Sequence, residues 1–263
     1  MPHININDCN IYYEIHGSGS ETIVLSHGLL WSGRMFYKQL TVLSTNYKVV
    51  TYDHRGQGKS EVTETGYDME SLYEDAVQLI EKLNLGRVHF GGLSMGGFVA
   101  MRLAARRSDL VKSLLLMETS AQGEPFTFKY NLLKTVVNAF GVKTVTNPIM
   151  KIMFGDTFLN DPKRAAEKQE WIAELQQNKK SVTKAVTGVI QRKSVENELQ
   201  NITCPTLILV GTEDKATIPE KAEFIASKIP QAKLVYIQNG GHTSSIEEPE
   251  QYNQAILEFL DRV

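Results

Sequence analysis

The stretch HFGGLSMGGFVAMRLAARR, residues 89–107, decides the fold. Residues 89–94 have the apolar character of a buried strand, and residues 95–107 have the period of a helix. Gly92, Ser94 and Gly96 lie where the strand would turn into the helix, in the pattern G-x-S-x-G. This pattern is typical of a strained turn that presents a serine hydroxyl at the end of a sheet and needs small neighbouring residues. The stretch therefore predicts an α/β sheet with Ser94 as a nucleophile.

A glycine-rich turn with an incidental serine would show the same five residues. The nucleophile is favoured because the required strand and helix are both present on either side of Ser94. The N-terminus of that helix would also direct its free backbone N–H groups toward the serine oxygen, which favours an anion forming there.

Apolar runs and helical patterns alternate along the chain, which indicates a mostly parallel sheet flanked by helices. Eight strands are expected, at 3–7, 11–15, 22–28, 48–53, 89–94, 111–118, 206–211 and 233–238. The first two would form a hairpin around Asp8-Cys9-Asn10. Helices are expected at 69–85, 95–107, 220–229 and 249–263. The pattern places the chain in the α/β class, with its chemistry at the carboxyl ends of the strands.

The segment from about 121 to 200 interrupts this alternation, because it contains several helical patterns and no good strand candidate. It follows the sixth expected strand. A helical block between two strands is either an inserted subdomain or a cap over the sheet. We expect a core domain of residues 1–120 and 201–263 and a helical cap of residues 121–200.

Composition excludes several classes of protein. The 263 residues carry a net charge of −2, which gives no basic excess for binding nucleic acid. No apolar run approaches the ~20 residues that a membrane helix needs, and the first residues lack a signal-peptide pattern, so a cytoplasmic protein is expected. Cys9 and Cys204 belong to no metal-ligand cluster, and no metal site is expected.

A serine nucleophile needs a base, and the base needs an orienting acid. For this turn the expected chain order is serine, acid, histidine. His242 is the only histidine after Ser94, and it follows the last expected strand. Glu213 and Asp214 follow the strand before it, at 206–211. The shorter side chain and deeper place of Asp214 favour it as the acid, with Glu213 as the second candidate.

Five segments carry a resemblance along the whole chain: SHGLL (26–30), DHRGQGKS (53–60), GLSMGG (92–97), GTEDKATIP (211–219) and GGHTSSIEEPE (240–250). Their order and spacing resemble those of the α/β-hydrolase superfamily, in its branch of small serine esterases, enol-lactonases and cofactor-free haloperoxidase-like proteins. This resemblance implies the α/β-hydrolase fold and no cofactor. It also supports Asp214 as the acid, since GxxD carries the acid in that family.

The resemblance further implies an oxyanion hole, formed by the backbone N–H groups of Leu29 and Met95. It gives His27 and the segment DHRGQGKS structural roles near the site. Trp31 is expected to face the substrate pocket because its loop must lie at the site. Some apolar residues of the cap would line the pocket, although most would form the core of the cap, among them Phe140, Met150, Met153, Phe154 and Trp171.

These features predict a serine hydrolase that cleaves a small-molecule ester or lactone through an acyl-enzyme on Ser94. A carbon–carbon bond hydrolase or a perhydrolase would use the same triad, and so would a small-molecule receptor of this fold with slow turnover. A serine nucleophile argues against the epoxide hydrolases and haloalkane dehalogenases of the superfamily, which use aspartate. Fold and triad do not identify the substrate, and the sequence makes no prediction of oligomeric state.

Overall fold

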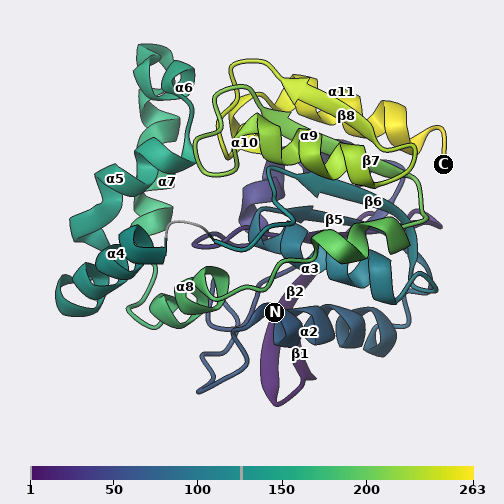
Figure 1. Ribbon diagram of the computed structural model, residues 1–263, viewed down its shortest axis with the longest axis horizontal. Coiled ribbons are helices and arrows are strands. Elements are labelled where there is room, and N and C mark those ends of the chain that lie inside the picture. Colours follow the sequence, from purple (N-terminus) through teal and green to yellow (C-terminus); the bar gives the residue numbers. More distant parts are fainter. Residues whose placement is uncertain (1, 125–126) are drawn as a thin grey trace.

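The computed structural model describes residues 2–124 and 127–263, and in this part of the chain an eight-stranded sheet forms the centre (Figure 1). Each strand overlaps one of the expected runs. The strands are β1 (His3–Ile6), β2 (Cys9–His16), β3 (Thr22–Ser26), β4 (Lys48–Tyr52), β5 (Val88–Leu93), β6 (Val111–Met117), β7 (Thr206–Gly211) and β8 (Lys233–Ile237). The expected α/β fold with a mostly parallel sheet is confirmed.

The strands follow the order β1-β2-β4-β3-β5-β6-β7-β8. β1 and β2 form an antiparallel hairpin, β2 is antiparallel to β4, and the pairs from β4 through β3 to β8 are parallel. The hairpin turn is tighter than expected: it consists of Asn7 and Asp8, and Cys9 already pairs with Ile6. Both turn residues have positive φ, 47° and 57°, as a two-residue turn requires.

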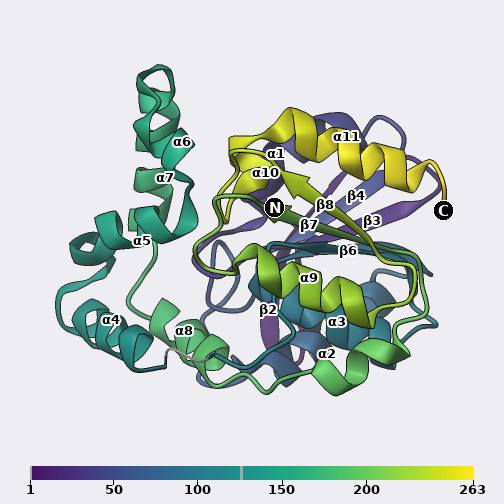
Figure 2. The ribbon, with the colours of Figure 1, turned by 45° about the horizontal axis from the view of Figure 1, so that its top comes forward.

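Helices cover both faces of the sheet (Figure 2). α2 (Met69–Lys82), α3 (Met95–Arg106) and α9 (Pro219–Lys228) pack on one face, and α1 (Tyr37–Leu43) and α11 (Pro249–Leu260) pack on the other. Successive side chains of a strand point to opposite faces. In β6, for example, Leu114 and Leu116 join the core under α2 and α3, whereas Leu115 and Met117 join the core on the α11 side. The chemistry must therefore lie at the strand ends.

The short helix α1 and the 3₁₀ turn before it, η1 (Gly33–Phe36), were not among the expected helices. Their apolar residues span too few turns to show a helical period in the sequence. Among the described residues, no helix is both long and apolar enough to cross a membrane.

The helical insertion after β6 is confirmed, and its helices α4 to α7 stand to one side of the sheet (Figure 1). The domain boundaries at 121 and 200 stay a prediction, and residues 125–126 of the expected cap lie outside the described residues. The segment between β6 and β7 contains α4 (Thr127–Phe140), η2 (Val142–Val145), α5 (Thr146–Met153), α6 (Asp156–Asn160), η3 (Pro162–Arg164), α7 (Ala165–Gln176), α8 (Val182–Ile190) and η4 (Glu196–Asn201).

The loop after β4, residues 53–60, braces the loop after β3. Asp53 accepts hydrogen bonds from the backbone N–H groups of Gly33 and Lys59, at 2.8 Å each. The His54 N–H donates to Nε2 of His27 at 2.9 Å. Burial lowers the pKa of both imidazoles, so both rings are neutral spacers between loops. These contacts agree with the structural roles that the resemblance implies.

Arg55 of the same loop forms a buried ion pair with Asp75 of α2. Its Nε and Nη2 donate to the two carboxylate oxygens at 2.7 and 2.6 Å, and the side chains of Arg55 and Asp75 are only 5% and 2% exposed. The ion pair connects the loop after β4 to helix α2.

Replacing Asp75 by Ala should lower the free energy of unfolding by about 3–5 kcal/mol, because it leaves the Arg55 guanidinium buried without its counter-ion. Denaturant unfolding followed by circular dichroism measures this. Asp109→Ala is the matched control, since Asp109 pairs with Arg107 at the surface with its side chain 62% exposed, and it should change stability little. If the two variants lowered the free energy of unfolding equally, the buried ion pair would stabilise the fold no more than the surface pair.

Candidate active site

Ser94 occupies the turn between β5 and α3 with a strained backbone. Its φ of 53° and ψ of −109° lie in a region that residues with a side chain rarely adopt. Three hydrogen bonds hold the turn: the Ser94 N–H donates to the carbonyl of Met117, and the Ser94 carbonyl accepts from the Phe98 N–H and from Oγ1 of Thr119. The strain exposes the hydroxyl at the carboxyl edge of the sheet.

The two glycines of the motif are required by space. A Cβ atom on Gly92 would lie 2.1 Å from the carbonyl oxygen of Gly96, and a Cβ on Gly96 would lie 2.1 Å from that of Ser26. Backbone atoms cannot yield as a flexible side chain can. The turn therefore depends on both positions remaining glycine, as the sequence pattern indicates.

His242 and Asp214 meet in the loops after β8 and β7. His242 Nδ1 lies 2.9 Å from Oδ2 of Asp214, and both residues are buried. Oδ1 of Asp214 accepts the backbone N–H groups of Ala216 and Thr217, at 2.8 and 2.9 Å, while Oγ1 of Thr217 donates to Oδ2 at 2.9 Å. The carboxylate is thus held in one orientation, and it selects the tautomer with a proton on Nδ1.

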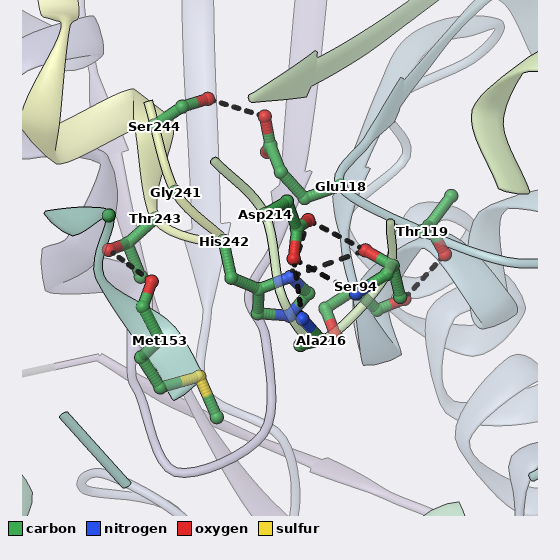
Figure 3. A network of polar contacts seen from close by, with 12 residues as sticks. Ser94, Glu118, Thr119, Met153, Asp214, Ala216, Gly241, His242, Thr243 and Ser244 are labelled. Carbon is green, nitrogen blue, oxygen red and sulfur yellow. Dashed lines mark hydrogen bonds and ion pairs between the residues drawn. The ribbon is translucent and has the colours of Figure 1, made fainter. Parts of the chain in front are cut away.

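Ser94 joins this pair at one cavity. Ser94 and His242 both line it, and Figure 3 shows Ser94, His242 and Asp214 gathered together from three separate loops. In the described part of the chain, no hydrogen bond yet joins the Ser94 hydroxyl to the imidazole. Such contacts are often long before a substrate binds, so the geometry is compatible with a base beside a nucleophile.

Two backbone N–H groups near Ser94 have no partner in the described residues, those of Leu29 and Met95. Leu29 also lines the cavity. A buried side chain, Gln57, joins their two loops: its Oε1 accepts the Leu30 N–H at 2.8 Å, and its Nε2 lies 3.8 Å from Sδ of Met95. Leu30 itself has a positive φ of 73°. The arrangement suits a pair of donors kept free for a developing oxyanion.

Glu213, the second candidate for the acid, points elsewhere. Its carboxylate accepts the backbone N–H and the hydroxyl of Thr157, at 2.9 and 2.6 Å, at the start of α6. It fastens the inserted helices to the β7 loop instead of reaching His242. The two neighbouring acids therefore have different partners, Thr157 for Glu213 and His242 for Asp214. The sequence alone did not decide between them.

Two further buried acids lie behind His242, and no signal in the sequence marked them. Glu118 follows β6, and Ser244 donates to its carboxylate (Figure 3). The hydroxyl of Tyr252 donates to the other carboxylate oxygen at 3.1 Å. Burial raises its pKa well above the usual value, and the charge of Asp214 adds to the rise. Glu247 lies in α10 (Ser244–Glu247), and burial raises its pKa to about 7.

The cavity lies between the sheet edge and the inserted helices, and its volume is about 120 Å³. From the core it is lined by Leu29, Leu30, Ser94, Phe98, Ala216, Thr217 and His242. Aliphatic side chains dominate the opposite wall, namely Val137, Val142, Val145, Ile149, Ile152, Met153, Val182, Val186, Val189 and Ile190. Polar groups contribute at Glu124, Lys134, Thr183 and Arg192.

Trp31, expected at the pocket, is not among the described lining residues. Its ring packs edge-on against Phe154 and Trp171 of the inserted helices, with centroids 6.1 and 5.5 Å away. The loop does reach the site through Leu29 and Leu30, but Trp31 packs between the core and the inserted helices. Of the apolar residues considered in that insertion, Met153 lines the cavity, whereas Phe140 is 73% exposed.

Comparison with known proteins supports the whole-chain resemblance. A relative named "Putative carbamate hydrolase RutD", from Rhizobium rhizogenes, is 28% identical over 259 residues, which cover 95% of this chain and 97% of the relative. The enol-lactonase of Burkholderia xenovorans has a TM-score of 0.92 at 26% identity, covering 99% of this chain and 100% of that one. An esterase of Thermogutta terrifontis, solved with malate bound, has a TM-score of 0.91 at 28% identity, covering 99% and 98%.

The family described as alpha/beta hydrolase fold matches residues 21–249, which include every segment that positions Ser94, Asp214 and His242. The sheet order and the helical insertion after β6 agree with this match. The chain belongs to the α/β hydrolase fold family.

Proposed function

We propose that the protein is a serine hydrolase that cleaves a small-molecule carboxylic ester or lactone through an acyl-enzyme on Ser94. The observation that carries the proposal is the buried hydrogen bond of 2.9 Å between His242 and Asp214, formed at the cavity that Ser94 also lines. The names of the structural neighbours, an enol-lactonase and an esterase, support the same class of reaction.

In the proposed reaction, Oγ of Ser94 attacks the carbonyl carbon while Nε2 of His242 takes the hydroxyl proton. Asp214 stabilises the imidazolium that results. The negative charge on the carbonyl oxygen is accepted by the N–H groups of Leu29 and Met95, and one such donor contributes roughly 2.7–4 kcal/mol to the transition state. As the tetrahedral intermediate collapses, the alcohol departs with the proton from His242.

Water then completes the cycle. His242 takes a proton from water, the hydroxide attacks the acyl carbon, and the ester bond to Ser94 breaks. The serine recovers its proton and the carboxylic acid leaves. A receptor of this fold would complete the first half of this sequence and stall, so steady-state turnover distinguishes an enzyme from a receptor.

The cavity supports an apolar acyl group of limited size. Its wall facing Ser94 consists mostly of valine and isoleucine, and its volume of about 120 Å³ is smaller than the ~150 Å³ of an engineered cavity that holds benzene. Apart from Glu124, Lys134, Thr183 and Arg192, the described residues of this wall offer no polar side chain to a small polar carbamate. This lining favours short aliphatic esters and lactones.

Ser94→Ala should abolish hydrolysis of p-nitrophenyl butyrate, lowering kcat on the order of 10⁴-fold or more, because the acyl group then has no acceptor. The release of p-nitrophenolate measures it at saturating substrate. An unchanged melting temperature shows that the fold survives. Full activity of the variant would rule out Ser94 as the nucleophile.

Asp214→Asn should reduce kcat roughly 10³- to 10⁴-fold, because an amide stabilises the wrong tautomer of His242 and leaves the imidazolium uncompensated. Glu213→Gln is the neighbouring control. Since Glu213 contacts Thr157 and not His242, this variant should retain kcat within about tenfold. The reverse order of effects would make Glu213 the orienting acid.

Across p-nitrophenyl acetate, butyrate, octanoate and palmitate, kcat/KM should be highest for the short acyl chains. Forcing extra methylenes into a filled site costs ~1–3 kcal/mol, so octanoate should react at least about tenfold more slowly than butyrate. Ile149→Ala removes side-chain volume from the aliphatic wall and so enlarges the cavity. This variant should reduce the difference in kcat/KM between butyrate and octanoate. A preference for palmitate in the unchanged protein would contradict a cavity of this size as the acyl site.

A further inference from the structure

Glu247 makes an unusual set of contacts for an acid outside the triad. Its Oε2 accepts the backbone N–H groups of Gly155 and Gly241, at 2.8 and 3.1 Å. Its Oε1 accepts the backbone N–H of Thr243 at 3.2 Å and the hydroxyl of Thr243 at 2.9 Å. Each carboxylate oxygen therefore faces two donors.

These donors lie on both sides of His242. Gly241 and Thr243 are its two neighbours in the chain, so one side chain holds the backbone before and after the imidazole. The position of Nδ1 against Asp214 depends on this backbone, which Glu247 holds without touching the ring. Glu247 contacts only the backbone beside His242, whereas Asp214 forms a hydrogen bond with the imidazole ring itself.

The remaining donor comes from the inserted helices. Gly155 is the residue before α6 (Asp156–Asn160), two residues after the cavity-lining Met153. Oγ1 of Thr243 also lies 3.0 Å from the carbonyl oxygen of Met153 (Figure 3). The same cluster thus connects the wall of the cavity to the histidine loop.

A buried carboxylate such as that of Glu247 destabilises a fold if nothing compensates its charge. The residue is only 2% exposed, and within the described residues no arginine or lysine pairs with its carboxylate. A buried acid without a counter-ion destabilises a fold unless hydrogen bonds compensate. Three backbone N–H groups provide that compensation, and the Thr243 hydroxyl adds to it by sharing its single proton between Glu247 and the Met153 carbonyl. Burial nevertheless raises the pKa of Glu247 to about 7.

We propose that Glu247 is a positioning residue: it holds the His242 loop and the segment 153–155 in one arrangement, so that the base and the cavity wall are aligned together. This rests on the proposed function for its catalytic readout. Glu213 provides a contrast, because its carboxylate fastens the insertion through the backbone N–H and the hydroxyl of Thr157, and these bonds do not involve the His242 loop.

An amide cannot replace this carboxylate. In Glu247→Gln one oxygen becomes an NH₂ group, which must face either the Gly155 and Gly241 N–H groups or the Thr243 N–H. Neither orientation of the amide satisfies the whole set, although volume and shape are conserved. The variant therefore removes contacts without creating a cavity.

The experiment compares Glu247→Gln, Glu213→Gln and the exposed control Glu250→Gln with the unchanged protein. Steady-state hydrolysis of p-nitrophenyl butyrate gives kcat and KM. Glu247→Gln should lower kcat roughly 10- to 100-fold, as a misaligned catalytic group does, with a smaller change in KM. Glu213→Gln should act mainly on KM, and Glu250→Gln should change neither parameter beyond about twofold.

A second measurement does not depend on turnover. The proton on Nδ1 of His242, bonded to Asp214, gives a downfield proton resonance in NMR spectra. Glu247→Gln should shift or broaden this resonance, and Glu213→Gln and Glu250→Gln should leave it in place. If the resonance moves in a protein that hydrolyses no ester, the positioning role stands and the proposed function fails.

Two outcomes would overturn the positioning role. One is a Glu247→Gln variant that melts at a lower temperature yet keeps its kcat and its Nδ1 resonance, which would make Glu247 a purely structural residue. The other is equal loss of kcat in Glu213→Gln and Glu247→Gln, which would attribute the effect to attachment of the insertion alone.

Discussion

The strained backbone at Ser94 is the constraint on which the rest of the site depends. A side-chain-bearing residue at φ 53° and ψ −109° costs on the order of 1–3 kcal/mol, and the surrounding structure must hold it there. Gly92 and Gly96 permit the turn, and hydrogen bonds from Ser94 N–H to Met117 and from Thr119 to the Ser94 carbonyl keep it in place. This backbone conformation exposes the Ser94 hydroxyl at the edge of the sheet, beside the first free backbone N–H of α3.

Around this turn, the site is assembled from loops that follow different strands, and buried polar contacts keep those loops in register. The loop after β4 braces the loop after β3 through Asp53, His54 and Gln57. Behind His242, Glu118 and Glu247 serve the loops after β6 and β8. A polar network of this kind costs stability wherever it is left incomplete, as it is at Nδ1 of His54, which is buried without a partner among the described residues.

Much of this was predictable from the sequence, because strand and helix periods and the glycine-flanked serine are local signals. The strands, the helical insertion after β6 and the order Ser94, Asp214, His242 all follow from such signals. The turn of the first hairpin was predicted less accurately and helix α1 was not predicted, since each involves few residues. Local patterns also placed Trp31 in the pocket, where the structure packs it against Trp171.

What the sequence could not reveal depends on contacts between distant segments. Nothing in IEEPE (246–250) distinguishes the buried Glu247 from its exposed neighbour Glu250, because burial depends on where Gly155 of the insertion lies. The division of labour between Glu213 and Asp214 likewise appears only when Thr157 and His242 are placed beside them. The wall of the cavity is decided by the packing of α4, α5 and α8.

Whether Ser94 is the nucleophile can be decided by peptide mapping after reaction with a fluorophosphonate. One phosphonyl group per chain is expected, carried by Ser94, together with loss of ester hydrolysis in proportion to labelling. Labelling of another residue, or hydrolysis that persists after Ser94 is fully labelled, would contradict this expectation.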